Sequence, residues 1–283
     1  MDPALERLVT VMGRRIFFDI ATCGCGSGCK YCYVKSSEIP QSLISIDDAM
    51  EIANNLIRLY SGKSMIISFC PNTEPFKSNS SKDIILSVIE KLSTHGFIFQ
   101  ISTKEVISDE TLSRVNSMCS FPKQVFFNIS IPMITESGHW EPKCSPVMQR
   151  FHNIQNISRH ESLTSCLYIK PFLEETLKDR TKFFDLLKIY PPDYIVIGFE
   201  FADKSAVMPC TMLHNPETAS QLSIKDLSKM GAFAKEMKDS FPQITNFSSV
   251  CNVNQCFSLQ CEIQLNKYDE LYCDGCLLCK GEV

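Results

Sequence analysis

The chain has 283 residues, of which 44% are hydrophobic and 21% charged, and its net charge is −4 at neutral pH. This length can bury a full core in one large α/β domain, so the fold needs no disulfide or metal to form. The negative charge argues against a broad basic surface for the phosphates of long DNA, and no apolar run approaches the roughly 18 residues of a membrane helix.

Cysteine is unusually abundant, with 15 in the chain. The first residues, MDPALERLVTVMGRR, lack the apolar segment and cleavage site of a secretory signal, so we expect a cytoplasmic protein with no membrane partner. A reducing compartment keeps thiols free, which disfavours a disulfide framework. The odd count also favours metal or cluster ligands over complete pairing.

Short β-branched or aromatic runs alternate with segments of helical period, a pattern typical of repeated strand–helix units. The predicted strands are Arg15–Ile20, Met65–Phe69, Phe97–Ser102, Gln124–Ile131, Ser165–Pro171 and Tyr194–Phe201. The predicted helices are 45–62, Lys82–Thr94, Asp109–Ser117, Pro146–Ser158 and Leu177–Ile189. In the first of these, Ser45 is the expected cap and Gly62 the expected end. The order predicts an α/β fold, a partial (β/α)6 parallel barrel.

The alternation stops after residue 201, and the chain divides into three predicted parts. Residues 1–216 form the barrel, 217–249 a helical connection, and 250–283 a cysteine-rich extension with few large aliphatic residues. Such a segment cannot fold on its own core, so we expect it to bind metal.

The stretch CGCGSGCKYCY, residues 23–33, lies just beyond the first predicted strand, at the end where parallel α/β folds build active sites. Cys25, Cys29 and Cys32 have the spacing Cys-x3-Cys-x2-Cys, and Gly26 and Gly28 allow the tight curl that brings three sulfurs together. Three thiolates on a [4Fe–4S] cluster leave one iron open to a small molecule. Zinc is the alternative, but it usually takes a fourth ligand, which only an unusually spaced Cys23 could supply nearby.

This motif, with aromatic Tyr31 directly before the last cysteine, resembles the signature of the radical S-adenosylmethionine (SAM) superfamily. Later segments are similar to its branch of spore photoproduct lyase and DNA repair photolyase-like proteins, over about residues 15–201. The resemblance implies a [4Fe–4S] cluster on Cys25, Cys29 and Cys32, bound SAM, and an external one-electron donor of the flavodoxin or ferredoxin type.

The resemblance also implies residues that contact SAM. Glu74, in ISFCPNTEPF, matches a carboxylate that holds the SAM amino group, and Lys104, in ISTK, matches a lysine that reaches SAM. Asn128 and Ser130 are the polar residues of FFNISIP, and one of them should face the site. Arg150, in EPKCSPVMQRF, is placed to bind the SAM carboxylate, with a salt bridge on a helix surface as the alternative.

Cys70 departs from the family pattern. Spore photoproduct lyase has a hydrogen-donating cysteine near this strand end, one position away in the alignment, whereas many relatives have glycine. A thiol is a good hydrogen-atom donor, so Cys70 is a candidate catalytic residue. The alternative is a small buried side chain, a common use of cysteine.

The extension contains six cysteines in 29 residues, including the metal-binding pattern CDGCLLC. They predict a second iron–sulfur cluster, with a zinc site as the alternative. The six are Cys251, Cys256, Cys261, Cys273, Cys276 and Cys279.

Together these features predict a radical SAM enzyme that cleaves SAM reductively to a 5′-deoxyadenosyl radical, which takes hydrogen from a substrate. The resemblance points to a nucleotide or nucleic acid as that substrate, and a peptide or small metabolite stays open. A different class of protein, a non-catalytic iron–sulfur or zinc scaffold or redox sensor, also fits a cysteine-rich chain.

Overall fold

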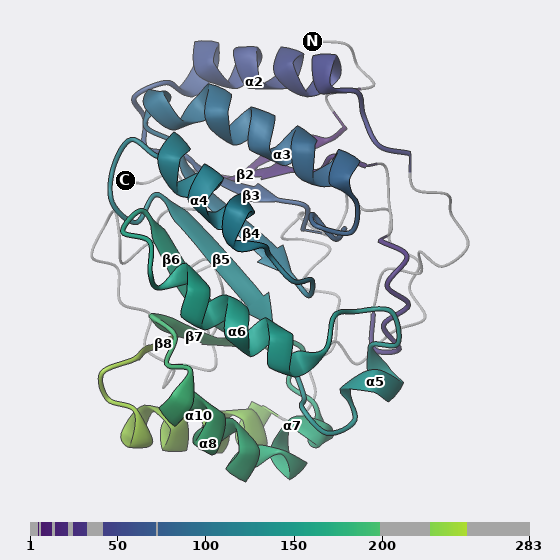
Figure 1. Ribbon diagram of the computed structural model, residues 1–283, viewed down its shortest axis with the longest axis vertical. Coiled ribbons are helices and arrows are strands. Elements are labelled where there is room, and N and C mark those ends of the chain that lie inside the picture. The colour runs from purple at the N-terminus through teal and green to yellow at the C-terminus, as the bar shows by residue number, and fades with distance from the viewer. Residues whose placement is uncertain are drawn as a thin grey trace.

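The computed structural model describes residues 5, 7–12, 15–21, 25–32, 42–71, 73–198 and 227–247, and it shows a single sheet with helices layered over one face (Figure 1). The strands are β1 Val9–Met12, β2 Arg15–Phe18, β3 Ile66–Phe69, β4 Ile98–Thr103, β5 Val125–Ser130, β6 Leu163–Ile169, β7 Tyr194–Ile197 and β8 Thr245–Phe247. The helices are α2 Ile46–Tyr60, α3 Asn79–Leu92, the 3-10 turn Ser93–His95, α4 Asp109–Met118, α5 Ser137–Trp140, α6 Val147–Ile157, α7 Glu174–Lys178, α8 Arg180–Ile189 and α10 Leu227–Ser240. No helix within these ranges is long and apolar enough to cross a membrane.

The eight strands follow their chain order across the sheet, from β1 to β8. The pairing of β1 with β2 is antiparallel, and every other pairing is parallel. Each of β2 to β7 is followed by a helix before the next strand, which confirms the expected α/β order of six strand–helix units. No pairing joins β8 to β1 in the described part of the chain, so the sheet is open.

The two edge strands were not predicted. β1 has four residues and β8 three, too few for alternation of side chains to give a signal. β8 pairs with β7, so part of the segment expected to be a helical connection joins the sheet instead. The helical expectation for that segment is met by α10, Leu227–Ser240.

The face of the sheet covered by helices is apolar and forms the main core. Ile16, Phe69, Phe99, Phe127 and Leu167 are each at most 1% exposed and pack in one cluster with the buried faces of the helices. Alternate residues of the same strands point to the opposite face. The large aromatic content of the core explains why short strands of four to six residues suffice to build the sheet.

The opposite face of the sheet, which we call the inner face, is also buried and combines apolar side chains, such as Ile66, Ile98 and Phe126, with polar ones. Across it, Arg15 donates hydrogen bonds to Ser68 and Gln100, and Ser68 donates to the Gln100 side chain over 2.8 Å. Nearer the carboxyl ends of the strands, the Asn128 amide donates to the Ser102 hydroxyl over 3.0 Å. Buried polar groups cost free energy unless they are hydrogen-bonded, so these side chains are held in place by their bonds to one another.

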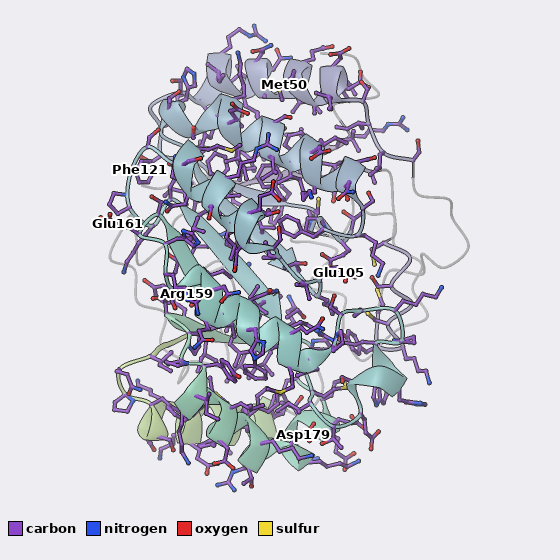
Figure 2. All side chains as sticks on the ribbon, in the orientation of Figure 1. Met50, Glu105, Phe121, Arg159, Glu161 and Asp179 are labelled. Carbon is purple, nitrogen blue, oxygen red and sulfur yellow. The ribbon has the colours of Figure 1, made fainter. Side chains whose placement is uncertain are left out.

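The predicted helices are confirmed in place, except that one of them is divided in two. Ser45 caps α2 in a capping box with Asp48, as expected for a helix that ends near Gly62. The predicted helix Leu177–Ile189 is instead two helices, α7 and α8, with a break at Asp179. The Asp179 carboxylate accepts hydrogen bonds from the amides of Ile134 (2.7 Å) and Thr135 (2.8 Å), which fixes the chain at that break (Figure 2).

Candidate functional site

The predicted site residues come from four neighbouring strand ends. The loop 25–32 follows β2, Cys70 and Glu74 follow β3, Lys104 follows β4, and Ser130 ends β5. Since β2 to β5 are parallel and adjacent, their carboxyl ends meet at one edge of the sheet. The fold therefore gathers at this edge residues that lie more than a hundred positions apart in the sequence.

The loop that carries Cys25, Cys29 and Cys32 has the tight course expected from its glycines. Gly26 and Gly28 have φ angles of +65° and +66°, a region that other residues enter only with strain. The amide of Cys32 donates to the carbonyl of Cys29 over 3.0 Å, which closes a turn between two of the three cysteines. None of the three forms a disulfide, and all three are half-buried.

A buried network anchors this loop to the rest of the fold. The Tyr31 hydroxyl donates a hydrogen bond to the Glu141 carboxylate, and the other Glu141 oxygen lies 2.7 Å from the Arg150 guanidinium. Arg150 also donates to the carbonyls of Ser130 and Ser145, each over 2.8 Å. The Glu141 and Arg150 side chains are 0% and 1% exposed, so this is a fully buried ion pair and not the surface salt bridge of the sequence alternative. The assignment of Arg150 to a SAM carboxylate stays a prediction.

Cys144 approaches the cysteine loop from the segment after α5. Its sulfur lies 3.7 Å from that of Cys29. This thiol contact, followed by Lys104, outweighs burial and lowers the pKa of Cys29 to about 7, while the contact with Cys29 and burial raise the pKa of Cys144. Cys29 is thus close to the thiolate form that binds iron or zinc.

Glu74 is held at the start of the site by contacts from β4 and the residue after it. The Thr103 hydroxyl donates to one carboxylate oxygen, and the Lys104 amide donates to the other over 2.8 Å. Burial raises the pKa of Glu74, against the lowering effect of these two hydrogen bonds. A carboxylate in this position can accept a hydrogen bond from a ligand ammonium.

The Lys104 ammonium is placed between the acids of the site and the cysteine loop. It lies 5.8 Å from the centre of the Tyr31 ring. Burial alone would lower its pKa, but Glu141, Cys29 and Glu74 together raise it. Lys104 therefore remains charged at neutral pH and supplies positive charge beside the loop.

Asn128 and Ser130 lie on the inner face, near and at the end of β5, and both are buried. The Asn128 Oδ1 atom and the Ser130 hydroxyl have no hydrogen-bond partner in the structure. A buried polar atom left without a partner costs free energy, and such atoms concentrate where a ligand completes the bonding. The expectation that one of the two faces the site and contacts a cofactor stays a prediction.

Cys70 has a left-handed backbone, with φ +52°, and is 1% exposed. Its side chain packs in the main core cluster. Burial, followed by the charge of Asp19, raises the pKa of the Cys70 thiol, so it stays protonated at neutral pH. The backbone conformation is one that favours glycine. The structure thus places Cys70 at the edge of the site and leaves both expectations for it as predictions.

Some of the predicted metal ligands lie within the described residues and others lie outside them. Cys251, Cys256, Cys261, Cys273, Cys276 and Cys279 lie outside the described residues, as does Cys23. Within those ranges, no three Cys, His, Asp or Glu side chains converge closely enough to hold a single metal ion. A cubane cluster requires no such convergence, because its cysteines bind different irons. Three cysteines on a glycine-curled loop fit that donor set.

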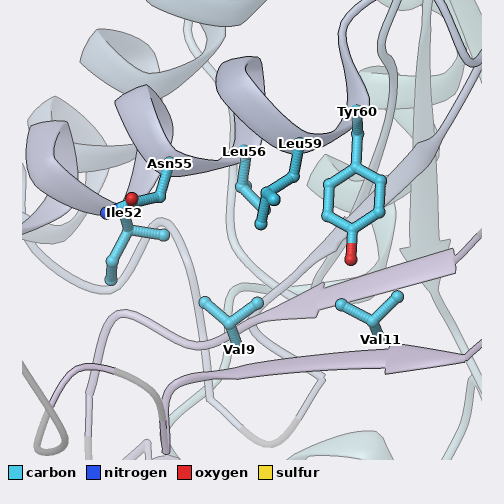
Figure 3. Close-up of a pocket in the computed structure, with 7 residues that line it drawn as sticks. All are labelled: Val9, Val11, Ile52, Asn55, Leu56, Leu59 and Tyr60. Carbon is cyan, nitrogen blue, oxygen red and sulfur yellow. The ribbon is translucent and has the colours of Figure 1, made fainter. Parts of the chain in front are cut away.

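A cavity of about 340 Å3 lies elsewhere, between β1 and α2 (Figure 3). It is lined by Val9, Val11, Ile52, Asn55, Leu56, Leu59 and Tyr60. None of the predicted site residues contributes to it, so this cavity is separate from the candidate site.

Sequence reasoning did not identify Glu141 or assign a place to Cys144. Both contact the cysteine loop across more than 100 positions of the sequence. The one sequence signal for these two residues was the motif EPKCSPVMQRF, in which a role was assigned only to Arg150.

No protein-family model matches the sequence, and no curated protein matches it. Among solved structures, spore photoproduct lyase complexed with dinucleoside spore photoproduct has a TM-score of 0.61 and 13% identity, covering 82% of this chain and 76% of that chain. A mutant of that lyase with bound AdoMet and dinucleoside spore photoproduct has a TM-score of 0.57 and 15% identity, covering 82% and 75%. Native anSMEcpe with bound AdoMet has a TM-score of 0.55 and 11% identity, covering 88% and 67%. The expected resemblance to spore photoproduct lyase is confirmed in the fold.

Proposed function

We propose that this chain is a radical SAM enzyme whose [4Fe–4S] cluster is held by Cys25, Cys29 and Cys32. The observation that carries the proposal is the meeting of this cysteine loop with Glu74, Lys104 and the end of β5 at one edge of the sheet. The same fold binds AdoMet in two of the matching structures. When bound, the cluster and SAM would supply one-electron chemistry that produces a carbon-centred radical able to take hydrogen from a substrate.

In this proposal the residues of the chain bind and orient SAM. Glu74 would accept hydrogen bonds from its ammonium group, and Lys104 would supply positive charge beside the cysteine loop. Asn128 and Ser130 would complete their unfilled hydrogen bonds with it. Tyr31 packs between Cys29 and the buried residues Met133 and Leu173, and so shields one side of the loop from water.

The proposed substrate is a nucleotide or nucleic acid, and the proposed partner is an external one-electron donor of the flavodoxin or ferredoxin type. The support for the substrate is the dinucleoside spore photoproduct bound in matching structures. The net charge of −4 favours a short or locally recognised nucleic acid over a long duplex. A peptide or a small metabolite is the alternative.

The experiment is anaerobic reconstitution with iron and sulfide, followed by dithionite and SAM, with 5′-deoxyadenosine measured by chromatography. We expect product from the wild-type chain and none after Cys25, Cys29 or Cys32 is changed to alanine. Cys119→Ala is the matched control, because this half-buried thiol bonds only to the Val115 carbonyl of α4 among the contacts the structure shows. Bound iron without SAM cleavage would instead favour a cluster scaffold.

The count of iron atoms tests the extension. About four per chain would indicate one cluster, and about eight would support a second cluster on the cysteines of residues 250–283. Zinc in that segment would appear as a separate metal in the same measurement.

A further inference from the structure

We infer that Glu141 is a positioning residue for the cysteine loop. Its carboxylate contacts Tyr31 on one side and Arg150 on the other, and it is fully buried. Tyr31 and Arg150 are not among the proposed cluster ligands. Glu141 therefore acts on the loop through Tyr31, which lies between Cys29 and Cys32 in the chain. The inference rests on the proposed function only for what the loop holds.

The contacts form one continuous connection from the loop to the sheet. Tyr31 donates to Glu141, Glu141 pairs with Arg150 over 2.7 Å, and Arg150 donates to the Ser130 carbonyl at the end of β5 over 2.8 Å. Ser130 and Asn128, two positions before it, each have a buried hydrogen-bonding atom without a hydrogen-bond partner. The network therefore fixes the distance between the metal-binding loop and the place where the inner face offers bonds to a ligand.

A second set of contacts comes from the same segment of chain. The amide of Lys30 donates to the carbonyl of Trp140 over 2.9 Å, and Trp140 packs against the cluster of Tyr31, Met133 and Leu173. Glu141 follows directly and holds the amide of Cys144 through its carbonyl over 3.1 Å. The main chain next to Glu141 is thus hydrogen-bonded to the cysteine loop through Trp140, and the Glu141 side chain adds a buried charge to this contact.

Burial decides why a charged residue is used. A carboxylate with 0% exposure is retained only where partners compensate its charge. Here the Tyr31 hydroxyl donates to one oxygen, and the Arg150 guanidinium lies 2.7 Å from the other as an ion pair, without a hydrogen bond to it. A charge-assisted hydrogen bond is stronger and more directional than a neutral one. Apolar packing of the Tyr31 ring has no directional preference of its own, so the bond to Glu141 adds orientation that packing lacks.

The first test uses the metal-free full chain, so that it does not depend on cluster binding. Hydrogen exchange is followed at the amides of Lys30 and Cys32 in the wild type, in Tyr31→Phe and in Glu141→Gln. Tyr31→Phe keeps the ring and the Glu141–Arg150 pair and removes one hydrogen bond. We expect exchange to rise about tenfold in both variants, the change that loss of one hydrogen bond of ordinary strength produces.

The matched control is Gln124→Ala, at the opposite end of β5. Gln124 is buried and donates to the carbonyls of Ser93 (2.7 Å) and Phe97 (2.8 Å), so its loss destabilises the same strand without touching the loop. Exchange at Lys30 that rises in Tyr31→Phe and Glu141→Gln but not in Gln124→Ala supports the inference. Exchange in Tyr31→Phe equal to that of the wild type overturns it, because Tyr31 would then be held by packing alone.

The second test uses the reconstituted protein. We expect iron release to a chelator to be about tenfold faster in Tyr31→Phe, and the change that SAM produces in the electron paramagnetic resonance spectrum of the reduced cluster to differ from the wild type. Unchanged release and an unchanged spectrum would contradict a positioning role. If the wild type binds no iron, the proposed function fails while the exchange result still decides the role of Glu141.

Discussion

Replacing Cys70 by glycine tests the strain that the structure shows at the end of β3. Cys70 has φ +52°, is 1% exposed, and is held by a 2.9 Å hydrogen bond from its amide to the Phe18 carbonyl. A left-handed backbone costs a residue with a Cβ about 1–2 kcal/mol relative to its ordinary conformation. Glycine does not incur that cost.

The magnitude follows from three contributions. Cys70→Ala keeps the strained backbone and loses the buried sulfur, for a destabilisation of about 1 kcal/mol. Going from alanine to glycine removes a buried methyl group, about 0.8 kcal/mol, and adds unfolded-state entropy, about 0.4–1 kcal/mol. Relief of about 1–2 kcal/mol of strain offsets both. The stabilities of the glycine and alanine variants should therefore differ by no more than about 0.8 kcal/mol in either direction.

The assay is urea unfolding of the metal-free chain under reducing conditions, with the free energy of unfolding extrapolated to water. Cys166 provides the control, because it is also fully buried but lies within β6 with an ordinary strand backbone. There glycine should be about 1.5 kcal/mol less stable than alanine. The same 1.5 kcal/mol difference at position 70 would refute the assignment of strain to Cys70.

Four further outcomes are expected. If Cys70 donates hydrogen, Cys70→Ala still forms 5′-deoxyadenosine but alters or stalls the product, and an unchanged product by mass spectrometry removes that role. Glu74→Gln should weaken SAM binding about 10- to 100-fold by calorimetry, the loss of a charge-assisted contact. Burial raises the pKa of Glu74, so the folded chain holds this proton more tightly than the unfolded chain. Stability therefore falls as pH rises from the ordinary pKa of ~4.3 through the raised pKa. Melting curves of Glu74→Gln between pH 4 and 7 should lack this decrease in stability. Arg150→Met should cost about 3–5 kcal/mol in urea unfolding by leaving Glu141 buried and unpaired, and adding Glu141→Gln should recover part of the loss.

The helical part of the fold could be predicted because its signals are local. Ser45 with Asp48, and an apolar face that includes Ala49 and Ile52, fix α2 without reference to the rest of the chain. The strand–helix order then limits the topology to a parallel sheet. The short edge strands β1 and β8 carry too few residues for such signals, and they form because a neighbouring strand offers hydrogen bonds.

The candidate site could be predicted only for residues that lie in recognisable motifs at the ends of predicted strands. The cysteine loop, Glu74 and Lys104 each follow a strand, so their meeting at one edge follows from the topology. Glu141 occupies a short turn after α5, and its contact with Tyr31 depends on how that turn folds back over the loop. No periodicity or spacing in the sequence reports such a contact.

The separation between an apolar face and a partly polar face of the sheet has a consequence for how such a protein can diverge. Residues that face the helices need only fill space with hydrocarbon, so many combinations of Ile, Leu, Val and Phe serve equally well. Inner-face residues such as Ser102 and Asn128 hydrogen-bond to each other across neighbouring strands and are not part of the helix-facing core. Substitutions on the two faces can then vary separately, and the same fold is found in solved structures at 11–15% identity.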